Sequence, residues 1–122
     1  MKIRLQGNSI RFRLKEPEVS ALAKNGSISE TVQLGVTDAL QFTVELCDAL
    51  HTSVILRDTT IRILLPQSSA VAFTEGEQVG IETKIDFGNG ASLLVLIEKD
   101  FACLHKSDAD NSGTYANPLA IG

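Results

Sequence analysis

Residues 92–104, SLLVLIEKDFACL, contain the stretch that decides the predicted fold. Five large aliphatic residues, Leu93 to Ile97, come directly after a segment with the turn residues Gly88-Asn89-Gly90. A short apolar run with such a boundary is typical of a strand at the centre of a sheet or of one buried on both faces. The sequence therefore predicts a buried strand. Its expected core residues are Leu93, Val95 and Ile97.

Alternation of apolar and polar residues predicts further strands before this run. The pattern is clearest in residues 40–46, where every second side chain is apolar. Strands are expected over about residues 3–5, 10–14, 28–34, 40–46, 52–57, 60–65, 79–87 and 93–99. Two short helices are expected over about residues 17–24 and 68–75. Pro17 suits a first helical turn, and Gly26 and Gly76 follow as stop signals.

The order strand, strand, helix, strand, strand occurs twice. Ser9–Leu14 resembles Thr60–Leu65 at an offset of 51 positions, from Ile10 to Ile61. Shared strand chemistry alone produces such similarity too, so duplication and coincidence both stay open. The predicted class is α+β, mainly antiparallel, with about eight strands in a barrel or strongly curved sheet and two short helices. Two duplicated halves favour this arrangement, and a closed barrel also removes exposed strand edges.

Length and composition fit one globular domain. The chain has 122 residues and a formal net charge of −4, which disfavours binding to nucleic acid. No segment approaches the roughly 20 apolar residues of a membrane span, so no membrane partner is expected. Two cysteines make no disulfide framework, and the first residues lack the apolar region of a secretion signal, so we expect a cytoplasmic protein. Residues 1–104 are expected to form the domain and residues 105–122 a polar tail.

Basic residues on the polar side of the predicted strands form the first candidate site. The anion-binding candidates are Arg4, Arg11, Arg13, Arg62 and Lys84. If this side faces a barrel lumen, bidentate arginine contacts could hold the phosphate or carboxylate groups of a small anionic ligand. The competing interpretation is a solvent-facing exterior with salt bridges, which is common for strands with one wet face.

The second candidate site is one that would hold a metal ion or contain a reactive thiol. The candidate metal ligands are Glu45, Glu82, Glu98, Cys103 and His105. The carboxylates could hold a divalent cation, and Cys103 with His105 could share a metal or ionise the thiol. Their spacing fits no zinc finger, and a cysteine at a strand end is usually a small core residue. The cofactor, if any, stays open.

The exit from the apolar run concentrates polar side chains. Glu98, Asp100, Cys103 and His105 lie within eight positions. If they converge with Arg11 or Arg13, they form a small polar pocket at the end of a rigid strand. The structural alternative is that Asp100 caps a turn and Cys103 fills an apolar gap. Further on, Asp108 to Gly113 follows the first half of a calcium loop, but Leu119 stands where such a loop needs a bidentate glutamate.

The two ends of the chain resemble a family of short uncharacterised bacterial proteins. The resemblance rests on KIRLQGNSIRFRL, residues 2–14, and on IEKDFACL, residues 97–104. It implies a bacterial cytoplasmic protein and assigns no functional residue. At the level of architecture the chain also resembles the triphosphate tunnel enzymes, whose barrel has two related halves. Their first-strand E-x-E-x-K motif is absent here, where Lys2-Ile3-Arg4-Leu5 occupies its place.

Two functions of different class follow from these patterns. The first is a small ligand-binding or interaction module. The alternative is a tunnel-type hydrolase or transferase that acts on a phosphorylated anion. The direction of the arginines separates them, because an enzyme of this type needs the basic residues around an enclosed lumen.

Overall fold

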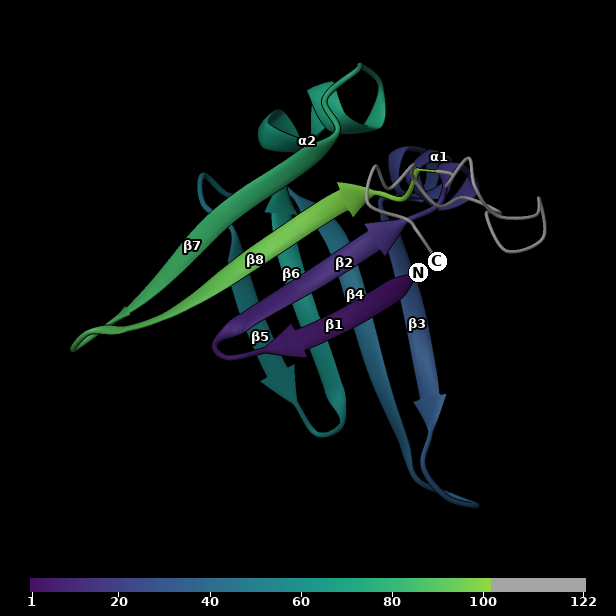
Figure 1. Cartoon of the computed structure of the whole chain (residues 1–122), viewed down its shortest axis with the longest axis vertical. Coiled ribbons are helices and arrows are strands. Elements are labelled where there is room, and N and C mark those ends of the chain that lie inside the picture. Colours follow the sequence, from purple (N-terminus) through teal and green to yellow (C-terminus); the bar gives the residue numbers. More distant parts are fainter. Residues whose placement is uncertain (102–122) are drawn as a thin grey trace, which may run out of the picture.

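The computed structural model describes residues 1–101, which form eight strands and two helices (Figure 1). The first half of the chain contains β1 (Lys2–Gln6), β2 (Ser9–Leu14), α1 (Glu16–Asn25), β3 (Ser27–Gln33) and β4 (Ala39–Cys47). The second half contains β5 (Ser53–Arg57), β6 (Thr60–Pro66), α2 (Gln67–Thr74), β7 (Gly80–Gly88) and β8 (Ala91–Lys99). These elements confirm the predicted α+β class. Neither of these helices is long and apolar enough to cross a membrane.

The strands of both halves are shared between two sheets. Sheet A has the order β1-β2-β8-β7, and sheet B has the order β3-β4-β6-β5. In each sheet two antiparallel hairpins are joined by one parallel pair, β2 with β8 or β4 with β6. Each half therefore contributes one hairpin to each sheet. Helix α1 carries the chain from sheet A to sheet B, and α2 carries it back.

The predicted barrel is replaced by a stack of two sheets. Within residues 1–101 the strands form two separate four-stranded sheets, which lie face to face with crossing strands (Figure 1). Both helices cover the same end of the stack. Because two layers can bury their apolar faces against each other, closure of a single sheet is not needed to cover them. The buried core residues are Ile10, Phe12, Leu14, Val19, Leu22, Phe42, Val44, Ile63, Leu65, Ala70, Phe73, Ile81, Val95 and Ile97.

The apolar run of the sequence forms β8, which lies between β2 and β7. Val95 and Ile97 are fully buried, as predicted. The prediction of nearly complete burial was wrong for Leu93, which is only partly buried. Leu93 pairs with Ile85 near the turn of the β7–β8 hairpin, and this hairpin extends beyond the stack (Figure 1).

Helix α1 fixes the chain between the two sheets. At its start the Glu18 carboxylate accepts a hydrogen bond of 2.8 Å from the backbone N–H of Lys15. At its end Gly26 has a φ of 80°, a left-handed conformation that glycine adopts without steric cost. Val19 and Leu22 are buried against the core. The helix therefore has a defined start, end and inner face.

The two halves place related residues at corresponding positions. Phe12 and Leu14 of β2 are buried, and so are Ile63 and Leu65 of β6, which lie 51 positions later. If each strand is replaced by the corresponding strand of the other half, β1 by β5 and so on, the strand order of sheet A becomes that of sheet B, read from the opposite edge. That the halves superpose as copies of one unit stays a prediction.

Truncation of Ile97 should destabilise the fold strongly. Ile97→Ala removes a fully buried side chain and leaves a cavity between the sheets, so the free energy of unfolding in urea should fall by about 2–4 kcal/mol. Leu56→Ala is the control because Leu56 is 70% exposed, and its effect should stay within about 0.5 kcal/mol. An equally small loss for both variants would show that β8 is peripheral to the core.

Candidate functional site

Four basic side chains lie together on the outer face of sheet A. In the pairing of β1 with β2, Lys2 is directly opposite Arg13, and Arg4 is directly opposite Arg11. The alternate residues of these strands pack toward the core, so the charged residues point the other way. We call Lys2, Arg4, Arg11 and Arg13 the basic face. The arginines of sheet A therefore lie outside the sheet stack.

Protection of a sheet edge explains only half of the basic face. Like charges directly opposite each other destabilise an antiparallel pair. Charges on an edge strand nevertheless discourage pairing with another chain, and β1 is an edge strand. This accounts for Lys2 and Arg4. Arg11 and Arg13 lie on β2, which is paired on both sides, and need another explanation.

A single carboxylate stands between the two arginines of β2. Oε1 of Glu98 lies 3.4 Å from Nε of Arg11 and 3.6 Å from Nε of Arg13. The parallel pairing of β2 with β8 creates this contact, because it places Glu98 beside Arg13. Nε of Arg11 is buried and has no hydrogen-bond partner among the described residues. Glu98 therefore offsets the charge of the arginines without satisfying the Nε donor of Arg11.

All four residues of the basic face line a small pocket. Its volume is about 180 Å³, and Lys2, Ile3, Arg4, Arg11 and Arg13 line it. Arg4 forms no ion pair with any residue of the range 1–101. Within residues 1–101, Arg4 is therefore a cation of this pocket without a carboxylate partner.

Arg62 lies on the other sheet in a closed ion pair. Its Nε lies 2.5 Å from Oε2 of Glu45, and its Nη2 lies 3.2 Å from Oε1 of Glu45. These hydrogen bonds hold the pKa of Glu45 below its usual value, while partial burial acts in the opposite direction. Arg62 is 51 positions after Arg11, so corresponding strand positions carry a satisfied arginine on sheet B and an unsatisfied one on sheet A.

The remaining predicted site residues are dispersed. Lys84 and Glu82 lie on β7, with β8 between them and the basic face. Glu45 lies on sheet B and Glu98 on sheet A. Residues 1–101 contain no group of three or more histidine, cysteine or acidic side chains that could hold a metal ion. Cys103, His105 and the segment from Asp108 lie outside the described residues.

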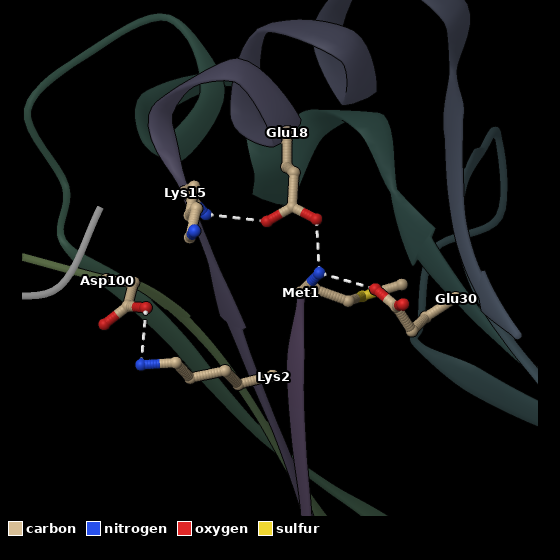
Figure 2. A network of polar contacts seen from close by, with 6 residues as sticks. All are labelled: Met1, Lys2, Lys15, Glu18, Glu30 and Asp100. Carbon is tan, nitrogen blue, oxygen red and sulfur yellow. Dashed lines mark hydrogen bonds and ion pairs between the residues drawn. The ribbon is translucent and has the colours of Figure 1, made fainter. Parts of the chain in front are cut away.

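A buried amino group positions the start of β1 (Figure 2). The Met1 amine donates hydrogen bonds to Glu18 of α1 and, over 2.6 Å, to Oε1 of Glu30 of β3. Next to it, Nζ of Lys2 lies 3.3 Å from Oδ2 of Asp100 (Figure 2). These contacts join sheet A to α1 and to sheet B, and so fix the strand that carries half of the basic face. No sequence pattern predicted them, because the partners of Met1 are far apart along the chain.

The two carboxylates change the titration of the Met1 amine. Burial of the amine lowers its pKa, but the hydrogen bonds from it to Glu18 and Glu30 outweigh burial and raise the pKa above the ordinary value of 8.0. The charged amine is therefore stabilised in the folded state. Its contribution to stability is fully present below the unfolded pKa and is lost as the pH rises through the folded pKa.

Replacement of Glu18 should change how stability depends on alkaline pH. Glu18→Gln should lower the free energy of unfolding at pH 7, and the decline above about pH 8 should become shallower because the folded pKa of the amine falls. Urea denaturation between about pH 7 and 10 measures both effects. Glu16→Gln, at an exposed position of the same helix, is the control. Identical alkaline profiles for Glu18→Gln and the control would contradict the role of the amine.

Comparisons with known proteins give one result. Searches of curated proteins and of solved structures returned no match. The model of a family of unknown function, DUF7009, matches residues 1–119. The match is consistent with the uncharacterised family that the ends of the sequence resemble. Because it spans nearly the whole length, the chain belongs to this family of unknown function.

Proposed function

We propose that the protein binds a small oxyanion, a phosphate or a carboxylate group, through the basic face. The observation that carries the proposal is the state of Arg11. It lies on an interior strand, its Nε is buried without a hydrogen-bond partner, and it shares one carboxylate with Arg13. A buried unsatisfied donor costs free energy that a bound oxyanion recovers.

The arrangement of charges suits an oxyanion. Cross-strand neighbours lie about 5 Å apart and alternate residues of one strand about 7 Å apart. Guanidinium groups at this spacing can donate parallel hydrogen bonds to two oxygens of one phosphate or carboxylate. The small volume of the pocket supports recognition of one charged group of a ligand. The whole chain has a net charge of −4, whereas this face carries four basic side chains.

Glu98 acts in this proposal as an internal competitor. Its carboxylate already occupies the position between Arg11 and Arg13 where an external anion would accept hydrogen bonds. The side chain of Glu98 is 33% exposed, so it can turn toward solvent when an anion binds. Removing its charge should therefore strengthen anion binding.

Isothermal titration with inorganic phosphate and, separately, with citrate tests the proposal at low ionic strength. Arg11→Gln should weaken binding by about tenfold or more, which corresponds to the loss of a charge-assisted hydrogen bond. Glu98→Gln should tighten binding by about threefold or more, because it removes a negative charge beside the anion. Preference for phosphate or for citrate distinguishes the two kinds of oxyanion.

Arg62→Gln is the matched control for this titration. It removes the same charge from the other sheet, at the position 51 residues after Arg11. The control should bind both anions as the unaltered protein does. Equal weakening by Arg11→Gln and Arg62→Gln would show that binding follows net charge alone and would contradict a site on the basic face.

The tunnel-type enzyme has no support in residues 1–101. It needs basic residues around an enclosed channel, whereas the side chains between the sheets are apolar and the arginines of β1 and β2 point outward. A binding module without a lumen is the function that this geometry favours.

We further infer an internal duplication and a location in the bacterial cytoplasm. The repeated element order and the related positions of Arg11 and Arg62 support the duplication. The low cysteine content supports the reducing compartment. Superposition of an experimental structure's two halves tests the first inference, and fractionation of cells that produce the protein tests the second.

A further inference from the structure

A larger cavity lies at the helical end of the molecule. Its volume is about 540 Å³, which is in the usual range of small-molecule sites. Helix α1, the end of α2 and the exit from β8 form its walls, and its lining includes Glu16, Val19, Ser20, Asp100 and Phe101. The arginines of the basic face do not line it.

Asp100, which lines this cavity, has a buried carboxylate oxygen without a hydrogen bond. Its side chain is only 2% exposed, and Nζ of Lys2 lies 3.3 Å from its Oδ2. That oxygen is nevertheless buried without a hydrogen-bond partner among the described residues. A buried carboxylate oxygen in this state is costly unless a donor reaches it. Within residues 1–101, Oδ2 of Asp100 therefore has the ion pair with Lys2 and no hydrogen bond.

Lys99 is the one cationic residue among the described residues that line the cavity, and its ammonium group contacts other parts of the structure. Nζ of Lys99 donates a hydrogen bond of 3.1 Å to the Gly76 carbonyl and lies 5.3 Å from the centre of the Phe73 ring. Among the described residues of the lining, two carboxylates, those of Glu16 and Asp100, therefore accompany one ammonium group, and Asp100 is also paired with Lys2. This pattern favours a cation over an anion.

We propose that the cavity binds a small organic cation, an amine with an apolar body. Its ammonium group donates hydrogen bonds to Asp100 and lies in the field of Glu16, and its apolar part packs against Val19 and Phe101. Such charge-assisted hydrogen bonds are about twice as strong as neutral ones. This proposal is independent of anion binding on the basic face.

Titration of the full chain with benzylamine, followed by amide NMR, tests this inference. Saturable shifts should appear at the amides that line the cavity. Benzyl alcohol, which has a similar shape and no charge, should bind at least about tenfold more weakly. Equal affinity for the two probes would reveal an apolar cleft without cation recognition. Absence of shifts with benzylamine would also overturn the proposal. That result is expected if another part of the chain fills the cavity.

Variants locate the benzylamine site. Asp100→Asn should weaken binding at least about tenfold. Because this change removes a buried charge, Ser20→Phe provides a second test, as it fills the cavity from an exposed position of α1. Ala23→Phe adds the same ring at an exposed position of α1 outside the lining and should leave binding unchanged. Unchanged affinity in Ser20→Phe would contradict binding in this cavity.

Discussion

The parallel pairing of β2 with β8, repeated by β4 with β6, is the interaction on which the rest of the structure depends. It joins a hairpin from each half of the chain into one sheet, so neither half completes a sheet by itself. The pairing also brings Phe12 beside Ile97 on the inner face of sheet A. Burial of these side chains between the sheets supplies the hydrophobic free energy that stabilises the stack.

The same pairing arranges the charges on the outer face. Side chains alternate along a strand, so the register that buries Phe12 and Ile97 sets Arg11, Arg13 and Glu98 on the opposite side. Glu98 thereby stands between two guanidinium groups that no local sequence contact would bring to it. The core and the candidate site are therefore two faces of one strand pairing. Anion binding on this face would add to a fold that is already complete.

Sequence patterns predicted the elements well and their assembly poorly. Alternation and turn residues located the strands and both helices, because these signals are local. The division into two sheets depends on which hairpins pair across the chain, and alternation is the same for a barrel and for a sandwich. The basic residues were predicted from the alternation of side chains along each strand, which places them on the polar side. Other features could be recognised only from the three-dimensional arrangement. They are the placement of Arg62 and Arg11 on different sheets, the role of Met1 and the cavity beside Asp100.

Anion binding on the basic face requires that Arg11 and Arg13 exchange Glu98 for an external anion. The most direct measurement is an NMR titration of the arginine Nε–Hε groups with inorganic phosphate at low ionic strength. We expect saturable shifts of the Arg11 and Arg13 signals with one affinity. The Arg62 signal should stay in place because Glu45 holds this side chain. Unchanged Arg11 and Arg13 signals, or equal shifts of all three, would contradict it.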